Sequence, residues 1–495
     1  MAGKLEIERK YELPDGFALP DLTGIGGVTA VGEPDDQRLD AVYYDTAGLH
    51  LARGRVTLRR RTGGNDAGWH LKRPAGGDRS ELQLPAGNRQ KTPPRAVVDQ
   101  VRALTRGADL SPVARIRTHR VERALRAADG STVALLADDT VSTESLRNGA
   151  GGAREWHELE IELVDGDAAA LERLDAALRK AGARPAKSPS KLAQALGPDY
   201  PAPSAVQPRG SKSRQALAAY IAAQRDALVE HDPHVREGDA ESVHKMRVAT
   251  RRLRSTLRSF RPLLAGDKDG DLDRLHDEIK WVTGLLGDVR DTDVMGERLA
   301  HLVHEEPEEL VLGPVAARIT SLLAARAAEA RRALVTGLDS ERYTSLLDDI
   351  DALVARTATP ENVPRKRLMA RARKALRRAD GRMDAARSDV EKHEARKAYK
   401  RARYAAELVA PVAGGTATKL ADRVTDLQDA LGDHQDAMVT GELLKQYAIT
   451  AYGAGENAFT YGLLHARIDE HGRRSLEDVP KARRKVRKAA RALYG

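Results

Sequence analysis

The sequence predicts two fold classes in one chain: an α+β domain built on antiparallel strands, followed by an all-α domain. Three observations carry this prediction. Charged and apolar residues alternate in short runs through the first 200 residues, as they do in β-strands. A Pro-rich segment at 201–208 then interrupts the chain, and beyond it long segments rich in Ala, Arg and Leu have helical periodicity. We therefore predict domains at 1–200 and 209–495, joined by a linker at 201–208.

The first predicted strand contains the sequence EIERK at Glu6–Lys10. Alternate residues of a strand point to one face. Glu6, Glu8 and Lys10 would therefore share one side, and Ile7 would point to the other. Two carboxylates and an ammonium group are expected next to each other.

The same alternation returns in later segments. Arg55, Arg59 and Arg61 alternate with Val56 and Leu58. Comparable runs place together His70 with Lys72, Arg79 with Glu81 and Gln83, Arg115 with Arg117, and Glu158 with Glu160 and Glu162. Gly- and Asn-rich segments between the runs are typical of turns. The pattern predicts a sheet of antiparallel strands.

A sheet with one face in water would explain any single strand of this kind. Six strands that offer charges of both signs favour instead a closed barrel lined with charge, covered outside by helices such as Asp167–Ala181. Carboxylates gathered at one place would hold a hard divalent cation, which takes oxygen ligands. Arginines and lysines elsewhere would hold a polyanion, because the guanidinium fork matches phosphate oxygens.

These motifs resemble the CYTH domain, the triphosphate tunnel metalloenzyme family, over about residues 3–200. The likeness is carried by EIERK at 6–10, YYDT at 43–46, LRRR at 58–61, LKRP at 71–74, ELEIEL at 158–163 and SK at 190–191. It implies an eight-stranded antiparallel tunnel that binds a triphosphate group together with Mg²⁺ or Mn²⁺.

The resemblance also implies roles for individual residues. The metal-side carboxylates would be Glu6, Glu8, Glu160 and Glu162, joined by Asp138 or Asp139, of which we favour Asp138. The phosphate-side cations would be Lys10, Arg59, Arg61, Lys72, Arg115, Arg117 and Lys191, and Arg79 is a further candidate for the same wall. Glu6, Glu8 and Lys10 are the expected catalytic residues.

Composition limits the other possibilities. The 495 residues include no cysteine, which excludes disulfides and thiolate metal sites. No apolar run approaches the length of a membrane span and no signal peptide is evident, so we expect a cytoplasmic protein without a membrane partner. The net charge of +9 favours an anionic partner, but three Phe and three Trp supply few surfaces for stacking bases, which disfavours nucleic acid.

The C-terminal half contains an internal duplication. The segment from His244 to Arg254 is echoed from His393 to Arg403, and Leu-Gly-Asp at 286–288 is echoed at 431–433. On a helix, residues at i, i+3, i+7, i+10 and i+14 form one narrow stripe. The stripes consist of His244, Arg247, Arg251, Arg254 and Arg258 in the first copy and of His393, Arg396, Lys400 and Arg403 in the second.

Two interpretations of these cationic stripes stay open. Acids such as Asp288, Asp291, Asp433 and Asp436 could pair with them. Alternatively, they repel one another until a polyanion compensates their charge. The C-terminal run Lys481–Arg491 has seven basic residues and no acid, which is typical of loose anion binding, and we predict no specific site there.

This half resembles the CHAD domain, the conserved histidine α-helical domain, over about residues 209–495. The paired histidines and arginines and the two Leu-Gly-Asp motifs carry the likeness. It implies two pseudo-symmetric four-helix bundles with a basic cavity that binds inorganic polyphosphate.

The two resemblances suggest one hypothesis. The chain would be a metal-dependent hydrolase of inorganic triphosphate or a related short polyphosphate, and its helical domain would target it to polyphosphate, including polyphosphate granules. There are two alternatives. The tunnel could use ATP as an adenylate cyclase does, or the chain could be a non-catalytic protein that binds polyphosphate granules. The sequence leaves open the metal and chain-length preferences and the oligomeric state.

Overall fold

The computed structural model divides the chain into two compact units, Met1–Ala205 and Val206–Gly495. The described residues are 4–14, 16–75, 78–85, 91–147, 153–188, 190–202, 209–264 and 270–495. For residues 4–6, 75, 78 and 79 this description covers the backbone only. Most of the linker predicted at 201–208 lies outside the described residues.

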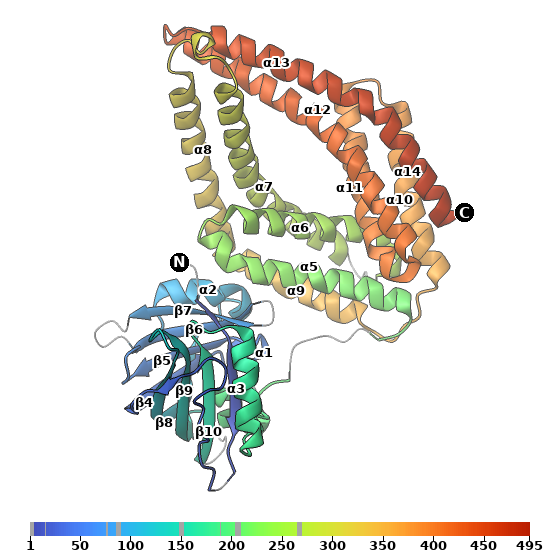
Figure 1. Ribbon diagram of the computed structural model, residues 1–495. Helices are drawn as coiled ribbons and strands as arrows, with labels where there is room; N and C mark the ends of the chain where they lie inside the picture. Colours follow the sequence, from blue (N-terminus) through green and yellow to red (C-terminus); the bar gives the residue numbers. More distant parts are fainter. Residues whose placement is uncertain are drawn as a thin grey trace. The chain divides into compact units, whose positions relative to one another are not determined.

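The N-terminal strand closes the barrel of the first unit. It is split at Ile7 into β1 (Lys4–Glu6) and β2 (Glu8–Glu12). Strand β1 pairs antiparallel with β7 (Asp78–Pro85), and β2 pairs antiparallel with β10 (Arg154–Leu163). Since β7 and β10 lie at opposite sides of the remaining sheet, the two halves of one strand join these sides around an interior (Figure 1).

The complete sheet has eleven described strands in the order β1-β7-β6-β5-β4-β8-β9-β10-β2-β11, with β3 paired to β8. The remaining strands are β3 (Ala30–Val31), β4 (Asp35–Asp45), β5 (Thr57–Thr62), β6 (Gly68–Ala75), β8 (Ser111–Arg126), β9 (Thr132–Ser145) and β11 (Arg184–Pro185). We expected eight strands. The difference arises because the first strand is split and because β3 and β11 are two-residue additions.

Helices and apolar clusters cover the outside of this sheet. Helix α3 (Ala168–Lys180) packs Leu171 and Leu174 against Leu136 of β9 and Ile161 of β10. The other helices of the unit are α1 (His50–Arg53), α2 (Arg95–Thr105) and α4 (Lys191–Leu196), followed by the 3₁₀ turn η1 (Gly197–Asp199). Because the apolar residues of the strands are used outside, the alternating charged residues are left for the interior.

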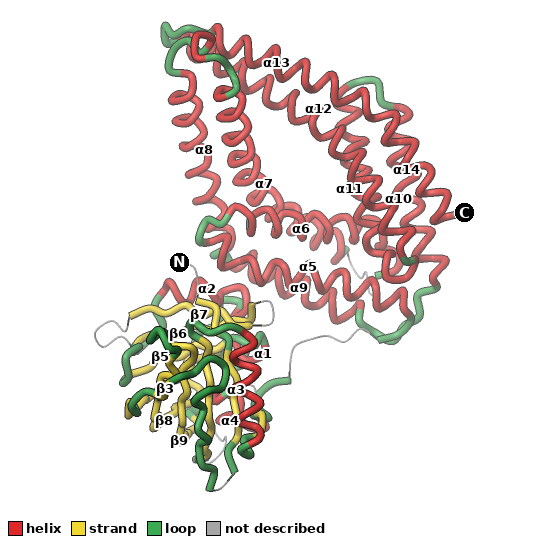
Figure 2. The backbone as a smooth tube through the Cα atoms, in the orientation of Figure 1, coloured by secondary structure: helices red, strands yellow, loops and turns green. Residues whose placement is uncertain are grey.

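The second unit is helical throughout its described part (Figure 2). Its first half contains α5 (Lys212–Arg236), α6 (Ala240–Phe260), α7 (Asp271–His304), α8 (Val315–Leu338) and α9 (Glu341–Thr357). Its second half contains α10 (Arg365–Ala385), α11 (Asp389–Ala413), α12 (Gly415–Gly453), α13 (Phe459–Ser475) and α14 (Val479–Tyr494). Short 3₁₀ turns occur at η2 (Arg261–Leu263), η3 (Glu308–Leu310) and η4 (Leu476–Asp478).

The duplication predicted from the sequence appears as two sets of five helices in the same order. The histidine stripes lie on α6 and α11, and the Leu-Gly-Asp motifs lie within α7 and α12. Helices α5, α6, α7 and α9 contact one another as one bundle, and α10, α11, α12 and α14 share a core as the other. This confirms the predicted all-α class.

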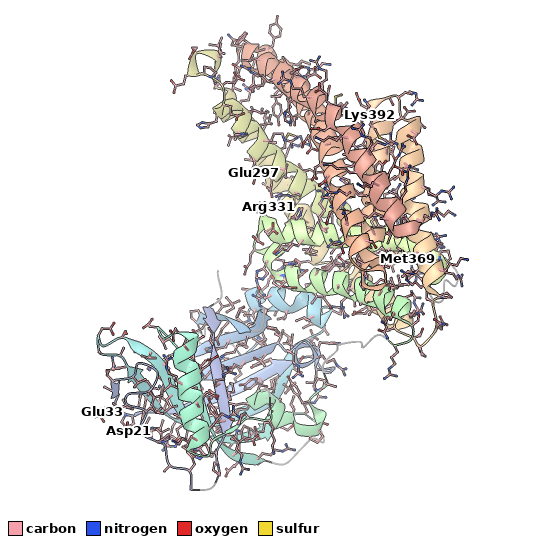
Figure 3. The ribbon with its side chains drawn as sticks, turned by 45° about the vertical axis from the view of Figure 1, so that its right-hand side comes forward. Asp21, Glu33, Glu297, Arg331, Met369 and Lys392 are labelled. Atoms are coloured by element: carbon pink, nitrogen blue, oxygen red, sulfur yellow. The ribbon has the colours of Figure 1, made fainter. Side chains whose placement is uncertain are left out.

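Two long hairpins extend from the bundles and meet at their tips (Figure 1). They consist of α7 with α8 and of α12 with α13, and Leu299 and Ile319 of the first pack with Leu444 and Leu464 of the second. Figure 3 labels Glu297 and Arg331 on the first hairpin. None of the described helices is long and apolar enough to cross a membrane.

Candidate functional sites

The barrel encloses a cavity of about 340 Å³. Because side chains alternate along each strand, the charged faces predicted from the sequence are brought together around this cavity. The predicted site residues that line it are Glu8, Lys10, Arg59, Arg61, Lys72, Glu160, Glu162 and Lys191.

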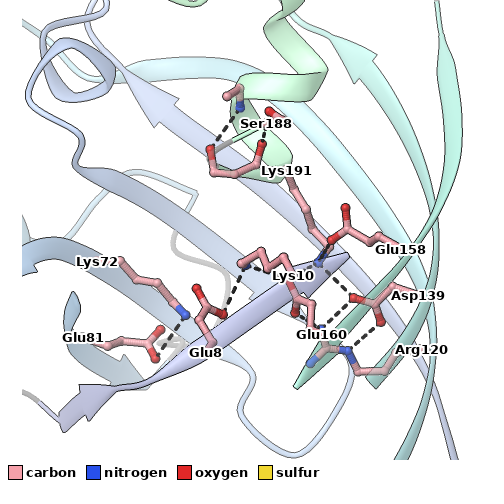
Figure 4. Close-up of polar contacts among 12 residues, drawn as sticks. Glu8, Lys10, Lys72, Glu81, Arg120, Asp139, Glu158, Glu160, Ser188 and Lys191 are labelled. Atoms are coloured by element: carbon pink, nitrogen blue, oxygen red, sulfur yellow. Dashed lines mark hydrogen bonds and ion pairs between the residues drawn. The ribbon is translucent and has the colours of Figure 1, made fainter. Parts of the chain in front are cut away.

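A buried lysine stands at the centre of three carboxylates in this cavity (Figure 4). The Nζ atom of Lys191, at the start of α4, lies 2.5 Å from Glu158, 2.8 Å from Glu160 and 2.9 Å from Asp139. One oxygen of each carboxylate lies within 4.8 Å of the others, so the trio could hold a metal ion. In this structure the ammonium group takes the place that such an ion would need.

Two more cations surround Glu160. Lys10 Nζ lies 2.6 Å from a Glu160 oxygen and 3.2 Å from Glu8, and Arg120 donates to Glu160 at 2.7 Å while it also pairs with Asp139. Burial alone would raise the pKa of Glu160, but Lys10, Lys191 and Arg120 outweigh it and hold that pKa well below its usual value. Glu160 is therefore a carboxylate bound by cations within the protein.

A second acidic group lies next to this cluster. Glu162 of β10 is the register partner of Glu8 on β2, and both line the cavity. Glu122 of β8 lines it as well, and burial, with repulsion from Asp35 and Glu162, raises its pKa despite the attraction of Arg120. Burial is the main cause of this shift, and the neighbouring carboxylates add to it.

Further cations line the same cavity on β5 and β6. Arg59 donates to the Tyr43 hydroxyl at 3.4 Å, Arg61 contacts Asp66, and Lys72 lies 3.8 Å from Glu81. Burial would raise the pKa of Tyr43, but Arg59 and the nearby lysines lower it, so the positive potential reaches this hydroxyl. The cavity thus combines a mixed cluster of carboxylates and cations around Glu160 with further cations on β5 and β6.

The helical unit has a larger cavity of about 940 Å³, between the α6–α7 and α11–α12 pairs. The predicted stripe residues that line it are His244, Arg247, Arg251, Arg254, Arg258, His393, Arg396 and Lys400. Both copies of the stripe therefore face one shared cavity, and eleven lysine and arginine residues line it against four described acids.

Pairing with acids neutralises only part of this charge. Arg247 pairs with Asp291 at 2.9 Å and Arg298 with Asp436 at 3.0 Å. Burial and neighbouring cations lower the pKa of Arg251, and they lower that of Lys400 to about 6. The cavity therefore holds cations that repel one another, as expected of a site for a multivalent anion.

The glycines of the repeated Leu-Gly-Asp motifs leave room for two of these arginines. A Cβ atom at Gly432 would lie 2.6 Å from the Arg396 guanidinium, and one at Gly287 would lie 3.7 Å from that of Arg247. The motif thus allows an arginine side chain to lie against the neighbouring helix.

Comparison with known sequences identifies both units. A family model of the CYTH domain matches residues 4–195, and one of the CHAD domain matches residues 219–445. The uncharacterised protein Rv2226 of Mycobacterium tuberculosis is 37% identical over 99% of this chain and 98% of its own length, and MT2285 from another strain gives the same values. The chain belongs to the CYTH–CHAD proteins.

Solved structures resemble this chain only distantly. PptA from Streptomyces chartreusis is 21% identical, covers 56% of this chain and 99% of its own, and has a TM-score of 0.45. The CHAD domain from the plant Ricinus communis is 24% identical, covers 58% of this chain and 93% of its own, and also has a TM-score of 0.45. No activity follows from likenesses of this size.

Three predictions for the CYTH unit need correction. Arg115 and Arg117 do not line the cavity: they point to the other face of β8 and pair with Asp40, Arg115 at 2.5 Å. Asp138 is half-buried and contacts His157 outside the barrel, whereas Asp139 is fully buried and pairs with Arg120 inside. Even-numbered residues of β8, such as Arg120, and odd-numbered residues of β9, such as Asp139, face the interior. Our prediction had placed odd-numbered residues of β8 and the even-numbered Asp138 there.

Two further candidates lie outside the described side chains. Glu6 in β1 is the register partner of Arg79 in β7, so their backbones lie next to each other. The roles predicted for both side chains stay predictions.

Sequence reasoning missed Arg120 and Glu122, which line the CYTH cavity, and Asp139 and Glu158, which contact Lys191 beside it. Glu158 points to the same face of its strand as Glu160, so the sequence pattern could have included it among the predicted site residues. Arg120 and Glu122 could not be chosen over Arg115 and Arg117, because β8 carries charges on both faces.

In the CHAD unit one stripe residue lies away from the cavity. Arg403 is 3.4 Å from Glu407, donates to Thr425 and stacks over the Tyr404 ring, because Glu407 ends the cationic stripe one turn later. Five cavity cations were not predicted: Lys280, Arg290, Arg298, Lys397 and Arg401.

Proposed function

We propose that the CYTH unit is a metal-dependent hydrolase of inorganic triphosphate or a related short polyphosphate, and that the CHAD unit binds inorganic polyphosphate and brings the enzyme to it. The observation that carries the first part is that one barrel cavity brings together the carboxylates Glu8, Glu122 and Glu162 and the cations Arg59, Arg61 and Lys72. Membership of the CYTH family, whose proteins are phosphohydrolases and cyclases of the tunnel type, supports the same reading.

The carboxylates fit a hard divalent cation such as Mg²⁺ or Mn²⁺, because they offer oxygen ligands alone. We assign this role to Glu8 and Glu162, which face each other across two paired strands, with Glu122 beside them. A cation at this place would stabilise the charged form of Glu122, which burial and the neighbouring Asp35 and Glu162 disfavour. Lys10 also lies 3.2 Å from Glu8, whereas Glu160 is bound by Lys10, Lys191 and Arg120 together and would position these cations.

A bound metal would supply charge neutralisation on phosphate oxygens and activation of a water. The remaining work falls to the cations of β5 and β6. Arg59, Arg61 and Lys72 would hold the phosphate oxygens and neutralise the charge that moves to the leaving group, which is most of what phosphoryl transfer requires of a protein. The small cavity volume favours a short phosphate chain over a bulky substrate.

The CHAD cavity supports the binding role. Burial and neighbouring positive charge disfavour the charged forms of Arg251 and Lys400 in the free protein, so an anion that enters the cavity would stabilise these charged forms. A linear polyphosphate can contact cations from both copies of the stripe at once, which a single phosphate cannot.

The decisive experiment incubates the full-length chain with Mg²⁺ or Mn²⁺ and with tripolyphosphate, ATP or long-chain polyphosphate, and identifies the products by ³¹P NMR. We expect orthophosphate and pyrophosphate from tripolyphosphate, and loss of this activity in Glu8→Gln and Glu162→Gln. Cyclic AMP from ATP would establish the cyclase alternative instead. Absence of turnover with every substrate, together with polyphosphate binding, would establish the non-catalytic alternative.

Binding is tested separately by charge reversal. Arg247→Glu combined with Arg396→Glu should weaken binding of polyphosphate far more than Arg473→Glu combined with Arg474→Glu, two exposed residues of α13 away from the cavity. Equal loss in both double variants would show that the cavity is not the binding site.

A further inference from the structure

The positive charge of the CHAD unit is concentrated on two helices of the second bundle. Helix α10 has nine basic and two acidic residues, and α14 has seven basic and no acidic residues, so that their joint net charge is +14. The whole chain has a net charge of only +9. These two helices therefore account for more than the entire excess of positive charge.

The matching helices of the first bundle provide an internal comparison. By order in the duplication, α5 corresponds to α10 and α9 to α14. Helix α5 has four basic and three acidic residues, and α9 has two basic and four acidic residues, which gives a joint net charge of −1. Since the bundle architecture is formed with either charge, packing does not explain the cations of α10 and α14.

Most of these cations are exposed. We call the outer face of the two helices the α10–α14 surface; it includes Arg373, Lys374 and Arg377 of α10 and Lys485, Lys488 and Arg491 of α14, all exposed. None of these six has an acidic partner at ion-pair distance among the described residues. The helices are neighbours, because Arg483 and Arg487 of α14 pair with Asp384 of α10 at 2.5 and 3.1 Å (Figure 1).

A second cavity lies beside the central one and is lined in part by α10. It measures about 760 Å³ and is lined by Arg378 and Arg382 of α10 and by Arg258 and Arg261 of α6 and the turn that follows it. Arg258 and Arg401 line both cavities. Burial and repulsion by Arg382, Arg258 and Arg378 lower the pKa of Arg401 despite the attraction of Glu394, so positive charge also dominates around this residue.

The features of the surface favour a flexible phosphate polymer over other anions. The apolar residues of α14, such as Val479, Val486 and Ala489, are buried in the bundle core and cannot enter a lipid bilayer. Tyr494 is the single aromatic residue of the two helices and packs against the same core, so stacking of bases is not available there.

We propose that the second cavity and the α10–α14 surface bind the part of a long inorganic polyphosphate chain that extends beyond the central cavity. This inference rests on the proposed binding of polyphosphate by the CHAD unit. A short chain fills the central cavity alone, whereas a long chain continues past Arg258 and Arg401 and gains contacts on α10 and α14. The CHAD unit thereby selects long chains over short ones.

The test uses the full-length protein in EDTA, so that hydrolysis does not consume the probe, and measures the affinity for long-chain polyphosphate and for a short oligophosphate at several salt concentrations. Two variants remove three cations each: R373Q/K374Q/R377Q on α10 and K485Q/K488Q/R491Q on α14. The matched control is R332Q/K445Q/R474Q, which neutralises three exposed cations on α8, α12 and α13 that line neither cavity.

Each released counter-ion contributes roughly 0.7 to the slope of log affinity against log salt for a single-stranded polyanion. We therefore expect either triple variant to reduce the slope for the long chain by roughly 2 and its affinity by about tenfold or more, with the short oligomer unchanged. The control variant should match the wild type for both probes.

Three outcomes would overturn the inference. Unchanged affinity for the long chain, while R247E/R396E abolishes it, would limit binding to the central cavity and leave the proposed function intact. A loss of duplex DNA binding in the triple variants, with unchanged polyphosphate binding, would assign the surface to nucleic acid. A wild-type chain that binds neither polyphosphate probe would refute both this inference and the proposed function.

Discussion

Lys400 offers a direct test of the electrostatic description of the CHAD cavity. The pKa of Lys400 is lowered to about 6, mainly by burial. The positive charges of Arg251, Arg396 and Arg247 lower this pKa further, and Asp436 partly opposes them. An uncharged side chain of similar length at this position should relieve the repulsion. We therefore expect Lys400→Met to stabilise the CHAD unit in the absence of ligand.

The size of the effect follows from the pKa. One pKa unit corresponds to about 1.4 kcal/mol, so the gap between the usual pKa of 10.5 and pH 7 corresponds to an upper bound of about 5 kcal/mol. The half-buried position and screening by salt reduce the expected gain to about 2 kcal/mol. Between pH 6 and pH 10.5 the unfolded chain binds more protons at Lys400 than the folded chain. The penalty is therefore complete below about pH 6 and fades as the pH rises towards 10.5.

Scanning calorimetry of the full-length protein at pH 6 and pH 9 would measure the change in the CHAD transition. The matched control is Lys397→Met, because Lys397 lies on the same helix and at the same cavity but is exposed and paired with Glu394. The gain from Lys400→Met should be larger at pH 6, and the control should give none.

Ligand binding provides a second measurement on the same residue. A polyphosphate beside Lys400 restores its proton, so binding near pH 8 should take up about one proton, seen by calorimetry in buffers of different ionisation enthalpy. Proton uptake that persists in Lys400→Met, or a variant no more stable than Lys397→Met, would refute the reasoning.

Further predictions concern both units. Arg120→Ala should reduce tripolyphosphate turnover at least tenfold, since a charge-assisted contact contributes about 1.5–3 kcal/mol, whereas Arg117→Ala should retain nearly full activity in the same assay. Gly432→Ala should displace the arginine that lies over it and weaken polyphosphate binding, whereas Gly287→Ala should be tolerated, because its added Cβ would make an ordinary contact. Acidification below pH 4.5 should lower the stability of the CYTH unit in thermal unfolding. The pKa of Glu160 is lowered in the folded protein, so its stabilising charge is fully present above pH 4.5 and is lost as the carboxylate protonates at lower pH. A thermal stability that does not change with pH below 4.5 would contradict this role of Glu160.

Local pattern was sufficient for much of this protein. The alternation around Glu8, Lys10, Arg59 and Glu160 places these residues in the barrel interior, because the period of two in a strand is a local property of the backbone. The repeated stripes similarly placed arginines of both copies at one cavity, because helical spacing fixes which residues share a face. The fold class and the family were therefore accessible from the sequence.

Tertiary structure decided the questions that the pattern left ambiguous. Strand β8 carries charges at both parities, so only its pairing with neighbouring strands selects Arg120 over Arg117 for the interior. The adjacent residues Asp138 and Asp139 point to opposite faces of β9. Helix α3 and its apolar cluster cover the face of Leu136 and Asp138, which leaves Asp139 on the interior face. The central position of Lys191 among carboxylates depends on a helix that follows the last barrel strand by almost 30 residues. Contacts of this kind join residues far apart in the chain, and no local spacing encodes them.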